Sequence, residues 1–247
     1  MITNRLNIGY DLDAWNTVKM RIPVTVDVSL STNSHILLSG LSGSGKSYHL
    51  NQIFAKLAKQ GGEFYFADYK GDDSFAHLRG LPHYYSYKET LTALDVVYSR
   101  LNDRLSGEDT SRKQITLIYD EYMANILALM NEDKKKAVEV MNKIAEILLM
   151  GRSMGVRLVA SMQRPDAVAF SHGSRLNFGI ICVLGGANRS IYEMLCPDFI
   201  EQIDTENRRF GRGEGVVVLQ GSRLKFVKVA VPQDYKKLQR LCIKALS

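Results

Sequence analysis

Apolar residues along the chain follow two alternating patterns. Short aliphatic and β-branched runs, such as residues 115–119, 158–160 and 180–183, are apolar at almost every position. Such runs are typical of strands in a parallel sheet that helices cover on both faces. With these runs included, the strands are predicted at residues 24–28, 36–39, 63–67, 115–119, 157–161, 179–184, 215–219 and 224–231.

Between these runs lie segments whose apolar residues recur every three or four positions, the spacing of one helix face. In residues 89–105 the stripe consists of Leu91, Leu94, Val97, Leu101 and Leu105. In residues 134–150 it consists of Val138, Met141, Ile144, Ala145 and Leu148. Helices are also predicted at residues 47–59 and 233–246. The alternation predicts an α/β fold with a mostly parallel, doubly wound sheet flanked by helices, then a C-terminal β-hairpin and helix.

Composition narrows the class of protein. The 247 residues are 45% hydrophobic and 23% charged, which excludes a disordered or collagen-like chain and predicts one domain over residues 1–247.

No run reaches the roughly 18 apolar residues of a membrane span. The polar N-terminus lacks a signal peptide core, so we expect a cytoplasmic protein. The three cysteines form no CxxC pair, which favours reduced thiols over a metal site.

A glycine-rich segment between the predicted strand 36–39 and the predicted helix 47–59 matches the pattern GxxxxGK[ST]. Such a loop directs backbone N–H groups at phosphate oxygens, and the helix N-terminus adds partial positive charge. The lysine would bridge the β- and γ-phosphates, and the final hydroxyl would bind Mg²⁺. The sequence therefore predicts a site for ATP and Mg²⁺. The motif consists of Gly40, Leu41, Ser42, Gly43, Ser44, Gly45, Lys46 and Ser47.

Two further polar groups follow apolar strands. Asp120 and Glu121 end the run 115–119, where Asp120 would hold Mg²⁺ and Glu121 would orient or deprotonate the attacking water. A glutamate in that position favours hydrolysis over transfer to a small acceptor. Gln163 follows the strand 157–161, and its amide can both donate to and accept from the γ-phosphate or water.

Together these motifs resemble the FtsK/SpoIIIE/HerA branch of P-loop motor ATPases. Residues 33–40 are similar to the family's approach to the P-loop, and residues 68–71 to its D-x-K-G segment. Residues 151–158 resemble its arginine-containing turn, and residues 161–165 its A-T-Q-R-P segment. A weaker match lies at residues 188–191, and the resemblance spans about residues 20–232. Conjugative coupling proteins share much of it.

The resemblance implies a RecA-like fold that assembles into a hexameric ring with ATP between subunits and moves DNA, double- or single-stranded, through its channel. By position Arg152 would be the arginine finger in a neighbour's site, with Arg189 as the other candidate; a helix-capping arginine is the alternative for Arg152. Arg164 would be a finger or stabilise the loop that carries Gln163. Asp68 and Lys70 would be a structural pair near the γ-phosphate.

The net charge of +6 is compatible with DNA but does not decide the partner. The candidate DNA contacts are residues 70–79, 104–113 and 171–175, and the basic loop 207–215 with Arg208, Arg209 and Arg212 could touch DNA, a neighbouring subunit or solvent. FtsK-type proteins usually carry membrane helices and a winged-helix domain, and neither is expected here. Loading onto DNA would then need a partner, such as a relaxosome-type protein.

The leading hypothesis is a DNA-translocating ATPase of a mobile element, acting in conjugation, replication or packaging. Two alternatives remain open at the level of sequence. One is an ATPase domain that drives protein secretion, and the other is an ATP-dependent assembly switch without translocation.

Overall fold

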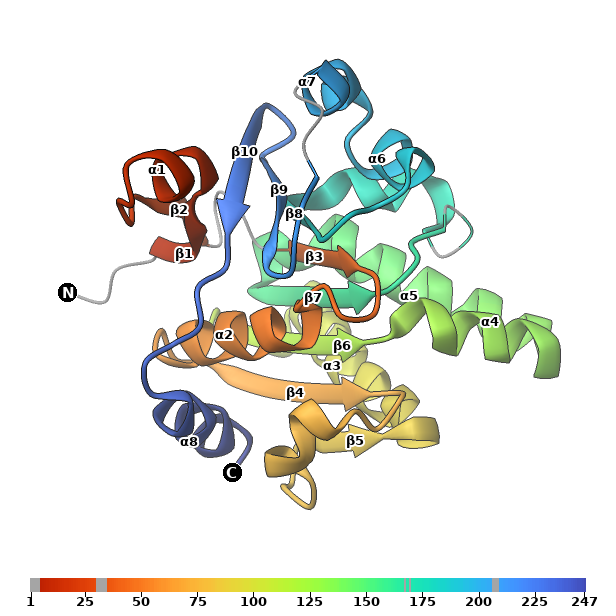
Figure 1. Cartoon of the computed structure of the whole chain (residues 1–247). Coiled ribbons are helices and arrows are strands. Elements are labelled where there is room, and N and C mark those ends of the chain that lie inside the picture. Colours follow the sequence, from red (N-terminus) through yellow and green to blue (C-terminus); the bar gives the residue numbers. More distant parts are fainter. Residues whose placement is uncertain (1–4, 30–34, 167, 169, 206–208) are drawn as a thin grey trace.

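Ten strands form a single sheet at the centre of the computed structural model (Figure 1). The model describes residues 5–29, 35–166, 168, 170–205 and 209–247. The strand order is β2-β1-β10-β9-β8-β3-β7-β6-β4-β5. The strands are β1 (Arg5–Asp11), β2 (Pro23–Asp27), β3 (His35–Gly40), β4 (Glu63–Asp68), β5 (Tyr84–Ser86), β6 (Ile115–Asp120), β7 (Val156–Met162), β8 (Phe178–Leu184), β9 (Glu214–Leu219) and β10 (Arg223–Lys228).

The sheet has a parallel part and an antiparallel part. Strands β8, β3, β7, β6, β4 and β5 pair in parallel, so their carboxyl ends meet at one edge of the sheet, here called the carboxyl edge. Their starts form the opposite, amino edge. Strands β9, β10, β1 and β2 continue the sheet antiparallel. Because β9 starts and β10 ends opposite the end of β8, both contribute backbone to the carboxyl edge.

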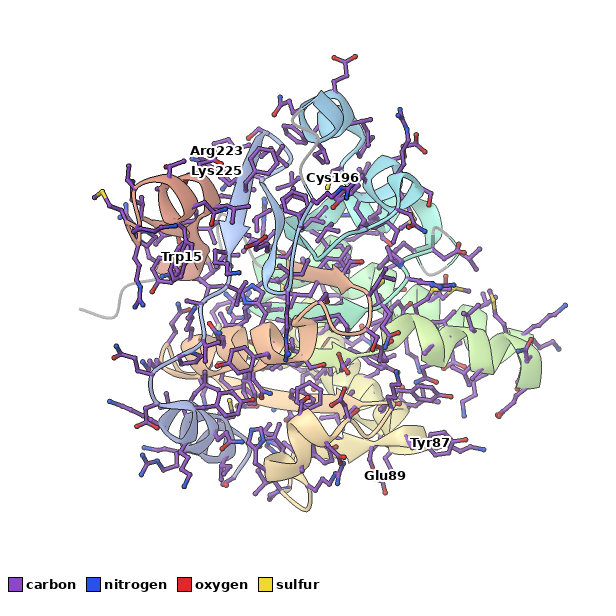
Figure 2. The ribbon with its side chains drawn as sticks, viewed as in Figure 1. Trp15, Tyr87, Glu89, Cys196, Arg223 and Lys225 are labelled. Atoms are coloured by element: carbon purple, nitrogen blue, oxygen red, sulfur yellow. The ribbon has the colours of Figure 1, made fainter. Side chains whose placement is uncertain are left out.

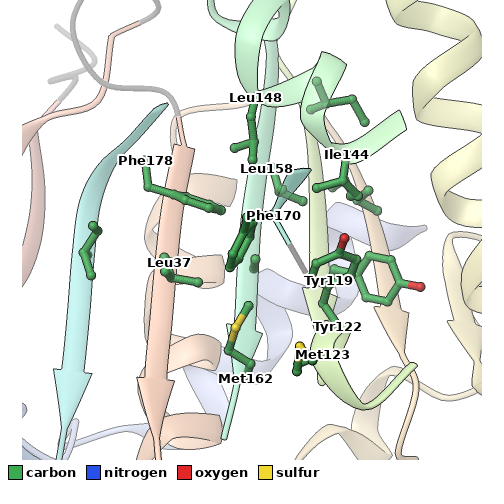
Figure 3. Packing of buried hydrophobic residues seen from close by; sticks show 14 of the residues in the cluster. Leu37, Tyr119, Tyr122, Met123, Ile144, Leu148, Leu158, Met162, Phe170 and Phe178 are labelled. Carbon is green, nitrogen blue, oxygen red and sulfur yellow. The ribbon is translucent and has the colours of Figure 1, made fainter. Parts of the chain in front are cut away.

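Helices cover the sheet on both faces, and successive strand residues therefore enter two different cores. Leu37 belongs to the core with α3, α4 and α5, whereas Ile36 and Leu38 belong to the core with α2 and α8. Figure 3 shows the first core, where Leu37, Leu158 and Tyr119 from three strands meet side chains of the helices. The helices are α1 (Leu12–Thr17), α2 (Lys46–Ala58), α3 (Thr90–Ser106), α4 (Tyr122–Glu132), α5 (Lys134–Met154), α6 (Arg189–Leu195), α7 (Ile200–Thr205) and α8 (Tyr235–Leu246).

The predicted fold class is confirmed, and the differences from prediction are local. Helix α5 continues to Met154 because Gly155 only there takes the left-handed conformation, with φ +72°, that ends it. Residues 122–132 form the unpredicted helix α4, and strands β1 and β5 were also not predicted. Val138 and Leu105, expected in buried stripes, are 48% and 39% exposed, whereas the unpredicted Ala137 and Val140 of α5 are buried.

Candidate nucleotide-binding site

The predicted P-loop lies at the carboxyl edge between β3 and α2. Gly43 and Gly45 have φ values of +81° and +94°, a backbone conformation that glycine adopts without steric cost. This path turns the chain sharply from the end of β3 into the first turn of α2. The N–H groups of that turn have no intrahelical partner, so they are available to an anion.

Lys46 is the centre of a buried polar cluster. Its Nζ lies 3.2 Å from Asp120 Oδ1, 3.0 Å from Glu121 Oε1 and 3.0 Å from Ser161 Oγ. Burial disfavours the charged amine, but the two carboxylates outweigh it and raise the pKa of Lys46. The lysine is therefore a fixed cation, and a phosphate that binds it must replace these oxygen contacts.

The two predicted carboxylates come from one strand end. Asp120 is the last residue of β6 and is buried, whereas Glu121 has a left-handed backbone with φ +56° and connects β6 to α4. A non-glycine residue in this conformation is strained by about 1 kcal/mol or more, and such strain gathers at functional positions. The turn brings both carboxylates to the same lysine, which the sequence order alone did not show.

The donor set fits Mg²⁺. Mg²⁺ binds in proteins through one or two carboxylates together with waters and substrate phosphates. Asp120 supplies such a carboxylate and Ser47 a hydroxyl, and in the described part of the chain no cluster of three acidic, histidine or cysteine side chains offers a complete protein cage. Bound there with a triphosphate, the ion would neutralise phosphate charge, while Glu121 is the side chain that can take a proton from water.

A hollow of about 390 Å³ lies over the P-loop. Gln163, directly after β7, lines it together with Lys46 and Ser47. Contact of Gln163 with the γ-phosphate or water stays a prediction. Lys70, Tyr235 and Gln239 also line it.

Asp72 is a site residue that the sequence did not reveal. Its Oδ2 accepts a hydrogen bond from Ser47 Oγ at 3.4 Å, and its Oδ1 accepts one from the Ser74 backbone at 2.8 Å. Partial burial opposes ionisation, but the hydrogen bond from Ser74 lowers the pKa of Asp72. The sequence suggested this segment only as part of the candidate DNA contact 70–79, since nothing in its composition shows where it packs.

Arg212 is the second unpredicted site residue. The Gly213 N–H donates to Ser44 O at 2.8 Å, and this bond fixes the start of β9 against the P-loop. Arg212 consequently lines the hollow beside Gly45. The only sequence signal was the basic loop 207–215. Arg209 of that loop is exposed, and Arg208 lies outside the described residues.

Asp68 stabilises the turn that follows β4 by accepting two hydrogen bonds. Its Oδ1 accepts from the Gly71 backbone at 2.8 Å, and its Oδ2 accepts from the Tyr84 hydroxyl at 2.7 Å. These bonds fix the turn that carries Lys70 and Asp72 toward the P-loop. Lys70 itself is exposed at the rim of the hollow.

The two arginine-finger candidates lie at opposite edges of the sheet. Arg152 is near the end of α5, exposed at the amino edge, and lines a separate hollow there with His35 and Leu176. It is therefore remote from the P-loop of its own chain. Arg189 begins α6 on the carboxyl edge, where its Nε forms an ion pair with Glu193 at 2.7 Å. Arg164, next to Gln163, is exposed.

The candidate DNA segments are also divided between the edges. Residues 70–79 lie beside the nucleotide hollow, whereas 104–113 and 171–175 precede β6 and β8 at the amino edge. The prediction of a DNA contact is wrong for Arg104, because this residue is buried. Its guanidinium donates to Asp109 Oδ2 at 2.9 Å and to Met154 O at 2.6 Å. It ties α3 to the end of α5 and is not available to a phosphate.

Comparison with known proteins now decides the family. The model of the FtsK/SpoIIIE family matches residues 14–164, more than half of the chain. The chain belongs to the FtsK/SpoIIIE family. Members are P-loop ATPases, so membership implies ATP hydrolysis.

Relatives agree with this assignment. The FtsK domain-containing protein YdcQ of Bacillus subtilis (strain 168) is 28% identical over 216 residues, covering 81% of this chain and 44% of YdcQ. Thus the chain spans less than half the length of this relative.

Solved structures share the fold. The conjugation coupling protein TcpA of pCW3, in a monomer form with ATPγS, superposes with a TM-score of 0.73 at 19% identity, covering 98% of this chain and 70% of TcpA. The cytoplasmic domain of the type VII secretion ATPase EccC of Thermomonospora curvata gives 0.66 at 20% identity, covering 99% of this chain and 31% of EccC. Both likenesses are to RecA-like P-loop ATPases.

Within the described residues, none of the helices combines the length and the apolar character that crossing a bilayer requires.

Proposed function

We propose that this FtsK/SpoIIIE-family protein is a cytoplasmic, DNA-translocating ATPase that works as a homo-oligomeric ring, a hexamer, on DNA of either strandedness and without strong sequence preference. In this proposal residues 1–247 form one motor domain that serves a mobile element in conjugation, replication or packaging. A separate protein loads it onto DNA.

The observation that carries the proposal is the placement of the arginines around the nucleotide site. The site brings together Lys46 with Asp120 and Glu121, which the proposal assigns to Mg²⁺ and to the attacking water. Gln163 lines the same hollow, while Arg152 lies at the other edge of the sheet. An arginine there reaches a nucleotide only if a second subunit places its carboxyl edge against it. A ring supplies that arrangement for every subunit, and an arginine finger given in trans stabilises charge in the transition state.

The surface around Arg152 suits an interface. Leu149 and Met150 of α5 are 56% and 44% exposed, and nearby Leu176 is 81% exposed. Exposed large apolar side chains beside a functional arginine are typical of a surface that another subunit covers. Under this proposal Arg152 is the finger, and Arg189 remains the second candidate.

DNA-dependent turnover tests the proposal. Steady-state ATPase activity is measured for the purified protein alone, with double-stranded DNA and with single-stranded DNA, at several salt concentrations. We expect DNA to stimulate turnover about tenfold or more, with the stimulation decreasing as salt rises, since phosphate contacts are salt-dependent. A rate that neither form of DNA changes would refute translocation on DNA while leaving the ATPase assignment intact.

Protein secretion is the second candidate function. The observation in its favour is the likeness to EccC over 99% of this chain. A related solved structure is described as EccC with a signal sequence peptide. Adding such a peptide to the same ATPase assay separates the two candidates, because secretion predicts stimulation by peptide and translocation predicts stimulation by DNA.

A further inference from the structure

Two tyrosine rings stack on each other at the carboxyl edge, just beyond the ends of two neighbouring strands. Tyr69 follows β4 and Tyr87 follows β5, which pairs with β4 in parallel. The ring centroids are 5.5 Å apart and the ring planes are 30° apart. Tyr69 is half-buried, whereas Tyr87 is 53% exposed, and Figure 2 shows Tyr87 at the margin of the molecule beside β5. The pair is therefore an aromatic surface that another molecule can reach.

The backbone of Tyr87 is strained. Its φ of +48° lies in the left-handed region, which a bulky aromatic residue adopts only at a steric cost. Glycine would adopt this conformation without that cost, but it would supply no ring. Strain of this kind gathers at binding sites and other functional positions. An exposed aromatic side chain on a strained backbone thus points to a role in binding, since neither feature serves the core of the protein.

Lysines lie at the margin of the two rings. The Lys88 ammonium is 5.8 Å from the centroid of the Tyr87 ring, and Lys70 is exposed at the rim of the nucleotide hollow. Lys88 also forms an ion pair with Glu132 at 3.9 Å, but the two side chains are 70% and 60% exposed. An ion pair this exposed contributes little, so Lys88 can exchange it for a phosphate. Because Glu132 and the exposed Glu89 balance the lysines locally, the rings must supply most of the affinity of this surface.

The turn that carries Tyr69 also contacts the nucleotide site. The Tyr69 N–H donates to the backbone oxygen of Asp120 at 3.4 Å. Lys70 lines the hollow over the P-loop, and Asp72 accepts a hydrogen bond from Ser47. One short turn thus joins the tyrosine pair to the residues that would hold Mg²⁺. A ligand on the pair is in a position to influence hydrolysis, which a motor that couples turnover to DNA requires.

We propose that Tyr69 and Tyr87 form a platform on which bases of single-stranded DNA stack. Lys70 and Lys88 then contact the phosphates between those bases. Aromatic side chains beside cationic groups bind single strands in this way, with little dependence on sequence, because every base has a flat face. The bases of a duplex are stacked on one another, so their faces are closed to the platform. The inference rests on the proposed function, and it names a contact through which the motor distinguishes a single strand from a duplex.

Comparing three oligonucleotides of equal length tests the platform. They are a single strand, a single strand whose sites are all abasic, and a duplex; each carries phosphates, but only the first offers open base faces. Binding is measured by fluorescence anisotropy of the labelled oligonucleotides in the presence of ATPγS. The proteins are wild type, Tyr87→Ala, Tyr87→Phe and, as a matched control, Tyr98→Ala, which removes a half-buried tyrosine of α3.

We expect Tyr87→Ala to weaken binding of the single strand about tenfold, since stacking of a base on an aromatic side chain contributes that much. Its affinities for the abasic strand and the duplex stay unchanged. Tyr87→Phe, which keeps a ring, and Tyr98→Ala bind all three oligonucleotides as wild type. A fluorescent base analogue in the single strand gives an independent readout, because its emission changes on stacking with wild type and not with Tyr87→Ala.

The outcomes separate the platform from the proposed function. Wild-type affinity of Tyr87→Ala for the single strand would overturn the platform while leaving DNA translocation in place. Equal losses for the single strand and the abasic strand would also overturn it, since they would assign Tyr87 a structural role. A wild-type protein that binds none of the three oligonucleotides, and whose turnover DNA does not change, would refute the proposed function itself.

Discussion

At the scale of single residues, Lys46 joins three segments that are distant in sequence. Its ammonium touches the end of β6, the turn into α4 and Ser161 of β7. The ends of two strands and the start of α2 are thus held by one buried cation. Removing one partner of such a buried pair leaves the remaining charge without compensation, which is strongly destabilising.

We expect Lys46→Ala to abolish measurable ATP binding. Charge-assisted hydrogen bonds of this kind contribute about 1.5–3 kcal/mol each, so loss of a cation that meets phosphates lowers affinity by about 100-fold or more. Calorimetry with Mg²⁺-ATP measures the effect. Lys59→Ala, which removes an exposed lysine just after the same helix, is the matched control and should bind as wild type. Equal affinity in Lys46→Ala and wild type would refute the site.

Glu121→Gln separates binding from chemistry. The amide keeps the size of the side chain but cannot take a proton from water, so nucleotide binding should persist while turnover falls by about 100-fold or more. Single-turnover hydrolysis with radiolabelled ATP measures it. Wild-type cellular function of Glu121→Gln together with lost hydrolysis would favour the assembly switch instead of a motor.

The sequence predicted the residues of this site that are contiguous or follow strands. Gly40 to Ser47, Asp120 and Gln163 are identifiable because chain order itself sets their places at the carboxyl edge. Arg212 and Asp72 were not identifiable, because one depends on the Gly213–Ser44 hydrogen bond and the other on the turn that Asp68 fixes. Such tertiary bonds leave no local pattern.

At the scale of elements, β9 is fitted against β8 at a position that only glycine permits. A Cβ at Gly215 would overlap the Val183 carbonyl oxygen and lie 2.9 Å from Leu184 Cα. We expect Gly215→Ala to reduce the free energy of unfolding by about 1–3 kcal/mol, the usual range for overpacking, as measured by urea denaturation. A Cβ at Gly186, in the nearby loop after β8, would meet nothing closer than Phe210 O at 4.0 Å, so Gly186→Ala should be nearly neutral. Similar stabilities for the two variants would show that β9 moves to accept the methyl group.

Two buried histidines make the folded state sensitive to acid. Burial, together with Arg157 and Arg152, lowers the pKa of His35 to about 3, and burial with Lys56 lowers that of His49 to about 3. Between pH 6.5 and 3 the unfolded chain binds these protons and the folded chain does not. Stability therefore falls as pH falls through this window, by about 1.4 kcal/mol per pH unit for each histidine.

Urea denaturation from pH 7 to 4.5 measures this slope. His49→Gln should reduce the slope of unfolding free energy against pH by about 1.4 kcal/mol per pH unit, the contribution of one proton, because glutamine does not titrate. His83→Gln, at a half-buried position, controls for the substitution itself. An unchanged slope in His49→Gln would show that His49 is protonated in the folded protein.

Long elements were easier to predict than short ones. Helices of 13 residues or more, such as α2, α3 and α5, show their periodicity over several turns. Helices α1 and α6 have six and seven residues, less than two turns, so no stripe can repeat in them. The unpredicted β1 is defined by pairing with β2 and β10, distant or irregular partners that a local pattern cannot reveal.

At the scale of the whole molecule, the two edges of the sheet carry different chemistry. The carboxyl edge has the P-loop and both acidic groups, and the amino edge has Arg152 with exposed apolar side chains. If the ring is correct, each active site takes its base from one chain and its finger from the next.

Mixed oligomers test this division. We expect Arg152→Ala and Glu121→Gln each to lose most ATP hydrolysis alone, and an equal mixture to recover a measurable fraction, because some interfaces then pair an intact base with an intact finger. The ATPase rate is measured across mixing ratios after subunit exchange. Arg189→Ala mixed with Glu121→Gln in parallel identifies the finger, and no recovery with Arg152→Ala at any ratio would assign Arg152 a structural role.

The short backbone connection between the P-loop and the last strands has a thermodynamic consequence. Ser44 O accepts from the Gly213 N–H, and Gly213 O in turn accepts from the Val229 N–H at 2.6 Å, so Gly213 links the P-loop backbone to the segment after β10. A ligand that contacts both the P-loop and the segment after β10 would then act on two ends of one hydrogen-bonded linkage. We therefore expect the ATP-binding free energies lost in Gly213→Ala, which strains this left-handed residue, and in Ser47→Ala not to add, and their double-mutant cycle would measure the coupling between the last strands and the phosphate site.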